Sequence, residues 1–283
     1  QKCLPEIEVV GEISDSLLYQ ALYTKDEVEI ERIRRMGRIT TSVVGQVADF
    51  LTSHAVKDEV LVKPGGQPLT IGEVKNKIDL WLAEFGAANP DGTIFAIGAD
   101  AGVPHSTGKP ADLLRLGQTI VFDIFPCERG GGYYYDFTRT WCLGYAPDEV
   151  QAVYETVLDT YRKVVSALKP GAVFKDYQGM TCDLYEAQGH ATLRTNPRAQ
   201  SGYVHGLGHG VGLHVHEKPS SSTLESNTDR LEPGVVFTIE PGLYYPERGM
   251  GVRLENTLHL RQDGKFEVLA PYPLDLVLPM RAR

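Results

Sequence analysis

The chain has 283 residues, of which 42% are hydrophobic and 23% are charged, an ordinary composition for a globular protein. Its formal net charge of −9 argues against binding to nucleic acid or to an anionic membrane, because both need a basic patch. No apolar run approaches the ~18 residues of a membrane-spanning helix, and the four cysteines are scattered, so we expect a reduced, cytoplasmic protein without membrane contact.

The predicted elements begin with a lead-in and two helices. Residues 1–23 hold a short strand at 7–10 and a short amphipathic piece at 17–22, too little for a domain. Thr24 and Glu27 have the spacing of a capping box, and the apolar residues behind them predict a long core-facing helix. Thr70 and Glu73 predict the start of a second helix, with Gly86 at its carboxyl end.

The order of helices followed by strands then occurs twice. Strands are predicted at residues 93–97, 119–125 and 133–141, the last two joined by a glycine-rich hairpin loop. Further on, helices are predicted at 148–168 and 174–186, strands at 235–239 and 252–260, and a short apolar strand and tail at 266–279.

The two runs of elements also resemble each other in sequence. A Leu-x-x-Gly motif ends six residues before Asp123 and again six residues before Glu240, and Asp-Glu-Val begins at both Asp26 and Asp148. These repeats are 117 and 122 residues apart, and no shift in composition separates them. We therefore expect one domain with two pseudo-symmetric α/β halves.

Residues 203–217 concentrate half of the chain's eight histidines: His205, His209, His214 and His216. Glycines alternate through the same stretch, which lets the backbone approach a ligand or another strand closely. Imidazole suits divalent metals and proton transfer near neutral pH, but the spacing is not that of an H-E-x-x-H helix. The stretch predicts an extended segment beside a metal or hydrolytic centre; the alternative is a histidine-rich loop without a ligand.

Four acidic residues lie in or next to apolar strand sequences: Asp123, Asp136, Glu240 and Glu255. A buried carboxylate costs several kcal/mol unless it is paired with a cation or binds a metal. Arg139 and Arg253 are close enough in sequence to pair with a single acid. Acids at symmetry-related positions, together with the histidines, favour a shared site for two divalent ions ~3.5–4 Å apart, with oxygen ligands that suit Mn²⁺, Fe²⁺ or Co²⁺.

The ordered motifs D-x(12)-D-x-T-R-T, H-G-x-G-H-G-x-G-L-x-x-H-E, E-P-G and V-R-L-E-N resemble those of the pita-bread metallopeptidases, in the branch of the Xaa-Pro dipeptidases (prolidases) and aminopeptidase P. The resemblance covers about residues 24–278. It implies an α+β pita-bread fold for residues 24–283, with the two halves around a curved antiparallel sheet. Residues 1–23 would be a linker left from a missing amino-terminal domain. The implied activity is a dinuclear metal-dependent hydrolase that cleaves the Xaa-Pro bond of dipeptides or peptide N-termini through a metal-bridging hydroxide.

The same resemblance implies a role for each residue of the site. The metal ligands would be Asp123, Asp136, His209, Glu240 and Glu255, with Asp136 and Glu255 bridging the two ions. Glu240 would also be the general base. His105, His205 and His216 would contact the substrate and take part in catalysis, and Arg253 would help to bind the substrate. The ions would be Mn²⁺, with Co²⁺, Zn²⁺ or Fe²⁺ as alternatives.

One departure from the family pattern, one unassigned histidine and two alternative functions stay open. Asn256 stands where the family often has an acid, and His214 either lines the pocket or faces solvent. The chain would otherwise be a non-proline amide or amidino hydrolase of the same fold, or a metal-free binding or scaffold module. The expected partners are a peptide with proline at its second position and a second copy of the chain in a homodimer.

Overall fold

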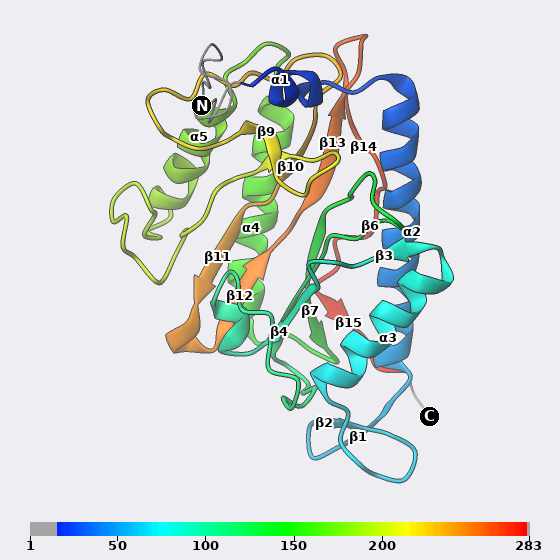
Figure 1. The fold of residues 1–283 in the computed structure, drawn as a ribbon. Helices are drawn as coiled ribbons and strands as arrows, with labels where there is room; N and C mark the ends of the chain where they lie inside the picture. The colour runs from blue at the N-terminus through cyan, green and yellow to red at the C-terminus, as the bar shows by residue number, and fades with distance from the viewer. Residues whose placement is uncertain (1–15, 282–283) are drawn as a thin grey trace, which may run out of the picture.

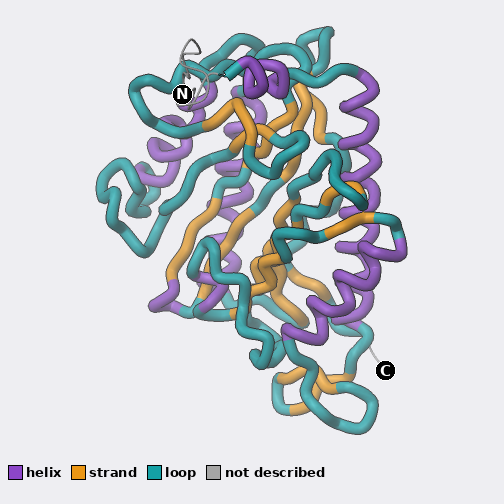
Figure 2. The backbone as a smooth tube through the Cα atoms, viewed as in Figure 1, coloured by secondary structure: helices purple, strands orange, loops and turns teal. Residues whose placement is uncertain are grey.

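The computed structural model describes residues 16–281, so the strand expected at residues 7–10 lies outside the described part. Five α-helices are present in that part: α1 (Leu17–Tyr23), α2 (Glu27–Thr52), α3 (Ile71–Glu84), α4 (Asp148–Ala167) and α5 (Phe174–Glu186). Figures 1 and 2 show α2 and α3 at the right of the strands in this view, with α5 at the upper left and α4 behind the strands. No helix within residues 16–281 is long and apolar enough to cross a membrane.

The two predicted helix starts have different outcomes. The capping box at Thr70 and Glu73 is confirmed. The one predicted at Thr24 and Glu27 is wrong by two residues, because the cap of α2 is Asp26, whose carboxylate accepts from Glu29 N at 2.8 Å while Asp26 N donates to the Glu29 carboxylate at 2.7 Å. Both sequences satisfy the same spacing rule, and an aspartate is as good an N-cap as a threonine.

Two sheets carry the pseudo-symmetric halves. The first has the order β15-β7-β5-β4, formed by Val277–Leu278, Phe137–Leu143, Thr119–Ile124 and Thr93–Ile97. The second has the order β14-β13-β10-β8-β9, formed by Phe266–Val268, Asn256–Leu260, Val236–Ile239, His209–Gly210 and Glu217–Ser220. In each half a central antiparallel pair, β5 with β7 or β10 with β13, repeats the same arrangement. The expected α+β fold with two similar halves is confirmed.

Three two-stranded sheets complete the described strands: β1 (Ala55–Lys57) with β2 (Val60–Val62), β3 (Ala87–Ala88) with β6 (Cys127–Glu128), and β11 (Gly242–Tyr245) with β12 (Met250–Arg253). Short 3₁₀ turns occur at Asp100–Gly102 and Pro246–Arg248. The single strand expected at residues 252–260 is therefore wrong. It is broken at Leu254 and Glu255, because β12 pairs with β11 whereas β13 pairs with β10. The strand expected at 133–141 likewise begins only at Phe137.

Hydrogen bonds from both backbone and side chains join the two halves where they meet. Thr257 Oγ1 donates to Asp136 O at 2.7 Å, and Glu255 N donates to Thr138 O at 3.1 Å. Thr140 Oγ1 both donates to Arg253 O and accepts from Arg253 N, each at 2.9 Å. These hydrogen bonds fix the residues just before β7 and β13 relative to each other across the pseudo-symmetry axis.

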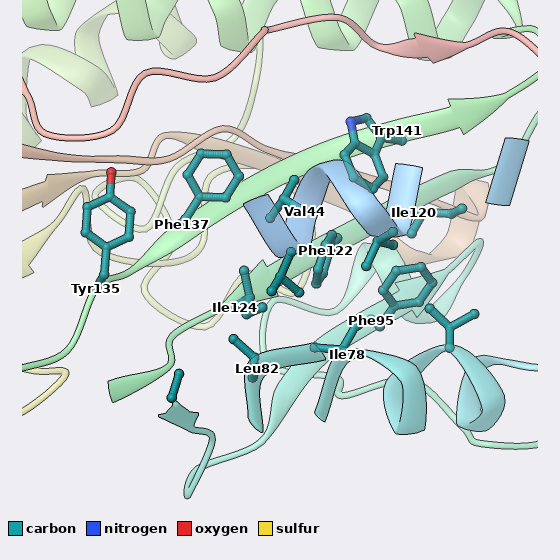
Figure 3. Close-up of a cluster of buried hydrophobic side chains, with 14 of the residues drawn as sticks. Val44, Ile78, Leu82, Phe95, Ile120, Phe122, Ile124, Tyr135, Phe137 and Trp141 are labelled. Carbon is teal, nitrogen blue, oxygen red and sulfur yellow. The ribbon is translucent and has the colours of Figure 1, made fainter. Parts of the chain in front are cut away.

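Apolar side chains from both helices and strands fill the space behind the first sheet (Figure 3). Val44 of α2, Ile78 and Leu82 of α3, and Phe95 and Phe122 of the sheet are all at most 1% exposed. The 3.6-residue period of the helices and the two-residue period of the strands bring these side chains to one core. Separate apolar clusters pack α4 and α5 against the second half.

The carboxyl-terminal tail packs beside a buried arginine. β15 pairs in parallel with β7, and Arg139 on β7 donates to Pro273 O at 2.8 Å and to Tyr272 O at 3.0 Å. Arg139 also donates to the Asn256 side chain at 3.0 Å, and burial lowers the pKa of this guanidinium to about 10. Within residues 16–281 it forms no ion pair with an acid, so carbonyl and amide oxygens take the place of a carboxylate partner.

Candidate metal centre and active site

A cleft of about 1070 Å³ lies where the two halves meet, and it is lined by all nine residues that the sequence singles out: His105, Asp123, Asp136, His205, His209, His216, Glu240, Arg253 and Glu255. They come from segments up to 150 residues apart in the chain, so the fold gathers them. Their convergence agrees with the prediction, while the role of each residue stays a prediction.

The four acids occupy equivalent places in the two halves. Asp123 lies near the end of β5 and Glu240 directly follows β10, while Asp136 and Glu255 directly precede β7 and β13. The irregular backbone at Glu255, which breaks the predicted strand, releases this residue from the strand ladder. Its carboxylate is then held by Thr138 Oγ1, which donates to Glu255 Oε2 at 2.7 Å.

The acids retain oxygens that no protein group satisfies. Asp123 Oδ1, Asp136 Oδ1 and Glu255 Oε1 are buried, and none has a hydrogen-bond partner among the described residues. Ligand atoms of Asp136, His209 and Glu255 lie within 4.8 Å of one another. Because buried polar atoms are almost always paired, unpaired carboxylate oxygens around a common centre fit the donor set of a hard or borderline divalent cation.

His209 presents its Nε2 atom to these acids. Its Nδ1 lies 3.0 Å from Gly210 O, and a carbonyl oxygen only accepts, so Nδ1 carries the proton. The unprotonated Nε2 is then 3.5 Å from Asp136 Oδ2 and 3.4 Å from Glu240 Oε1. Burial lowers the pKa of His209 to about 4, which keeps the imidazole neutral as metal coordination requires.

Burial raises the pKa of three of the carboxyl groups, those of Glu240, Asp136 and Glu255. It raises the pKa of Glu240 to about 8, and it raises the pKa of Asp136 well above its usual range, with further contributions from Asp123 and Glu240. Burial and then Asp136 do the same for the pKa of Glu255. Carboxylates held this close repel each other in the metal-free protein, and a bound cation would relieve the repulsion.

We expect the metal-free protein to lose stability as the pH rises from about 6.5 to 8. Glu240 has a pKa of about 8 in the folded protein, against ~4.3 in an unfolded chain, so between these values the folded state holds the extra proton. The stabilisation of the folded state by this proton is fully present below pH ~4.3 and is lost as the pH rises through 8. The loss is at most ~1.4 kcal/mol for each pH unit and each extra proton. His205 and His209, whose pKa values burial lowers to about 3 and about 4, affect stability only below ~6.5.

The measurement is thermal unfolding of chelated protein at pH 6.5, 7.2 and 8.0, with and without saturating Mn²⁺. The melting temperature of the chelated protein should fall across this range, and Mn²⁺ should remove most of the fall because cations replace the protons. A flat or rising melting temperature without metal would contradict the expected sign.

A hydrogen-bonded chain joins Asp123 to His205 through two other side chains. Arg253 Nη2 donates to Asp123 Oδ2 at 2.6 Å, and Arg253 Nη1 donates to Tyr244 Oη at 2.6 Å. Tyr244 Oη lies 3.0 Å from His205 Nε2. Since the guanidinium only donates, the phenol keeps its own proton for His205 Nε2, which leaves the His205 proton on Nδ1, 3.8 Å from Glu240 Oε2. Arg253 therefore does pair with an acid, Asp123. This ion pair is part of the site and does not replace the proposed metal centre, because Asp123 Oδ1 stays without a partner among the described residues.

Sequence reasoning missed Tyr244. Its position four residues after Glu240, in the strand-like run that follows E-P-G, was the available signal. We expect Tyr244→Phe to lower kcat/KM about 10- to 100-fold, the usual cost of losing a group that orients a site residue, with metal content unchanged. Steady-state kinetics and metal analysis measure this. Tyr245→Phe is the matched control, because the Tyr245 hydroxyl contacts His190 Nδ1 at 2.6 Å and neither residue lines the cleft. Equal kinetics for the two variants would refute the assignment.

The remaining histidines lie at different depths. His216 packs its ring 4.3 Å from that of His209, and desolvation lowers the pKa of His216. His105 lies on the exposed side of the cleft, next to Pro104, whose carbonyl accepts from Arg253 Nη1 at 3.2 Å. His214 also lines the cleft, but its side chain is 66% exposed, so it belongs to the rim.

The extended conformation expected for residues 203–217 is only partly found. β8 spans His209–Gly210 alone and pairs with β10 at Phe237 and, through a bulge, with β9. Most of the stretch is turns, which place its histidines around the cleft. The glycines allow these turns to pack closely: a Cβ on Gly208 would lie 2.1 Å from Thr238 O, and one on Gly210 would lie 2.0 Å from Lys218 O.

Two similar α/β halves around a cleft of carboxylates and histidines define the pita-bread class of metallopeptidases, and solved structures share the fold. The prolidase from Pyrococcus furiosus superposes with a TM-score of 0.75 at 27% identity, covering 91% of this chain and 68% of that one. The chain belongs to metallopeptidase family M24, whose model matches residues 31–262. The expected family and fold are therefore confirmed.

Curated relatives are similar to a large part of the chain. A putative dipeptidase of Bacillus subtilis is 36% identical over 186 residues, which are 66% of this chain and 47% of that protein. The Xaa-Pro dipeptidase of Pyrococcus horikoshii is 33% identical over 251 residues, which are 88% of this chain and 63% of that protein. The chain thus spans between about half and two thirds of the length of these relatives.

Proposed function

We propose that the chain is a dinuclear metal-dependent peptidase that hydrolyses the bond before proline in dipeptides or at peptide N-termini. The observation that carries the proposal is the cluster of buried acids beside His209, with three carboxylate oxygens that have no hydrogen-bond partner within residues 16–281. The similarity to proteins named Xaa-Pro dipeptidase supports the choice of substrate.

In this proposal Asp123, Asp136, His209, Glu240 and Glu255 would hold the two divalent ions. Bound ions supply Lewis-acid polarisation of the scissile carbonyl and make the hydrolytic water more acidic. The oxygen-rich ligand set supports Mn²⁺ as the resident ion, with Co²⁺, Zn²⁺ or Fe²⁺ as alternatives. A homodimeric assembly and a cytoplasmic location are further parts of the proposal, as is the assignment of residues 1–23 to a linker and 24–283 to the catalytic domain.

Glu240 is the general base of the proposed reaction. Its side chain is 16% exposed and lies between His205 and His209. Bound cations would keep Glu240 deprotonated, and its carboxylate then takes a proton from the attacking water. The same carboxyl group then returns this proton to the nitrogen of the leaving proline.

The histidines position the substrate and stabilise developing charge. His205 stays neutral, since burial lowers its pKa to about 3, and its Nδ1 lies 3.8 Å from Glu240 Oε2, on the side of the ring from which it would donate to a substrate oxygen. His105 and His216 line the more open part of the cleft, where they contact the residues flanking the scissile bond. Arg253 fixes the positions of Asp123 and Tyr244 by donating a hydrogen bond to each of them.

The test is hydrolysis of Ala-Pro, Ala-Pro-Ala and Ala-Ala by chelated protein before and after addition of Mn²⁺, Co²⁺ or Zn²⁺. We expect metal-dependent release of alanine from the proline peptides only, and the preferred length will separate dipeptidase from aminopeptidase activity. Failure to cleave any of them, in protein shown to bind two ions, would overturn the proline specificity and favour another amide substrate. Failure to bind metal would overturn the enzymatic proposal and favour a scaffold module.

A further inference from the structure

A buried ion pair outside the acid cluster joins the start of α2 to the histidine-rich segment. Lys25 Nζ donates to Glu217 Oε2 at 2.8 Å and to Leu22 O at 2.7 Å, and both charged side chains are only 2% exposed. The cost of desolvating two charges offsets most of their attraction, so a buried pair of this kind is a weak source of stability. A role in fixing a particular conformation explains it better.

Glu217 holds the turn formed by residues 212–216. Its Oε1 accepts from His214 N at 3.0 Å. A Cβ on Gly212 would lie 2.3 Å from Glu217 Oε2, so only glycine lets the carboxylate lie flat against the turn. The other side of the turn is held by Tyr134 N, which donates to Gly212 O at 2.8 Å. Val215 and His216, at the end of this turn, line the cleft.

The pseudo-symmetry of the chain shows that the start of the helix does not itself require a lysine. Asp-Glu-Val begins at Asp26 in the first half and at Asp148 in the second, which makes Pro147 the counterpart of Lys25 in the sequence repeat. By helix position the counterpart is Ala146, because Asp26 caps α2 and Pro147 caps α4, and neither counterpart is a lysine. Pro147 caps α4 without any side-chain hydrogen bond. Lys25 is therefore particular to the half whose helix begins next to the histidine-rich segment, where α1 also packs against β9 (Figure 1).

We infer that Lys25 is a positioning residue of the active site. By fixing the Glu217 carboxylate, it holds the turn 212–216 in the conformation that keeps His216 packed against His209 and directed into the cleft. The inference rests on the proposed peptidase function, because it assigns Lys25 an effect on substrate through His216.

The test compares the wild-type chain with Lys25→Met/Glu217→Met, which removes both charges and keeps the volume. The double change avoids leaving one charge buried alone, and water can replace the acceptor of His214 N because that residue is exposed. We expect a melting temperature close to that of the wild type, unchanged metal content and a 10- to 100-fold loss in kcat/KM. Amide exchange at His214, measured by NMR, should accelerate at least tenfold. The single variant Lys25→Arg, with Glu217 unchanged, should keep most of the wild-type activity because it preserves the positive charge.

The matched control is Lys163→Met, which removes an exposed lysine that pairs with Asp159 on α4 and should leave both readouts unchanged. A double variant with wild-type kcat/KM, or with unchanged exchange at His214, overturns the inference. A wild-type chain that cleaves no proline peptide overturns the proposed function instead, and the exchange comparison then still decides whether the ion pair holds the turn.

Discussion

Asp136→Asn is expected to lower kcat/KM of the metal-supplied protein by about 10³-fold or more. Asp136 Oδ1 has no hydrogen-bond partner in the described part of the chain, and the carboxylate belongs to the compact group that includes His209 and Glu255. A neutral amide is a poor ligand for a divalent ion, and the ions are expected to supply several kcal/mol of transition-state stabilisation, at tenfold per ~1.4 kcal/mol. Steady-state kinetics with Ala-Pro and counting of bound metal measure the effect.

The same substitution should make the metal-free protein more stable above pH 6.5. Asp136 is strongly repelled by its neighbours, and its pKa is raised well above the usual range by burial and then by Asp123 and Glu240. A variant that loses activity but melts at a higher temperature is folded, so its loss of activity is a functional effect. This combination is expected where the residues of a functional site destabilise the fold. Asp263→Asn, in a surface turn, is the control. Near-normal activity of Asp136→Asn would remove this residue from the proposed metal centre.

Gly208→Ala is expected to cost ~3 kcal/mol or more of folding free energy and most of the activity. A Cβ at this position would lie 2.1 Å from Thr238 O and 2.9 Å from Thr238 C, backbone atoms of β10 that cannot move aside alone. Overpacking of this kind forces a backbone shift. The shift would carry His209, the next residue, away from Asp136 and Glu240, and a displacement of about 1 Å is enough to cost ~10²-fold in rate. Urea unfolding and metal titration measure the two effects.

Gly206→Ala is the matched comparison for stability and metal affinity. It lies two residues earlier in the same motif, and a Cβ there would meet only Ser221 Oγ, at 3.4 Å. Alanine should be tolerated there with a change of less than ~1 kcal/mol. Equal melting temperatures for the two variants would show that the segment has room to adjust, against the close packing described above.

The sequence indicated which residues converge on the cleft better than it predicted the backbone that brings them together. Asp123, Asp136, Glu240 and Glu255 could be found because carboxylates are rare in apolar strands and because two of them follow the same Leu-x-x-Gly motif. Periodicity also located the long helices, and α5 has the predicted bounds of 174 and 186. These features depend on residues close together in the chain, so they can be recognised in a single sequence.

The missed features depend on contacts between distant residues. The break at Leu254 and Glu255 follows from β12 and β13 having different partners, which the mixed apolar and polar sequence of residues 252–260 does not reveal. Tyr244 and Lys25 act through partners 9 and 192 residues away in the chain. Arg139 and Asn256 became interpretable only once the fold brought them together, where an amide oxygen takes the place of an acid beside the guanidinium.

The contacts of Arg139 also set a limit on how far the chain could be shortened. Two of its acceptors, Tyr272 O and Pro273 O, belong to the tail that runs into β15. Deleting that tail would leave a guanidinium without these acceptors three residues from Asp136, at the seam between the halves. A minimal folding unit must therefore extend through Leu278, some sixteen residues beyond the end of the family match. Domain dissection guided by family boundaries alone would remove part of the support for the metal centre.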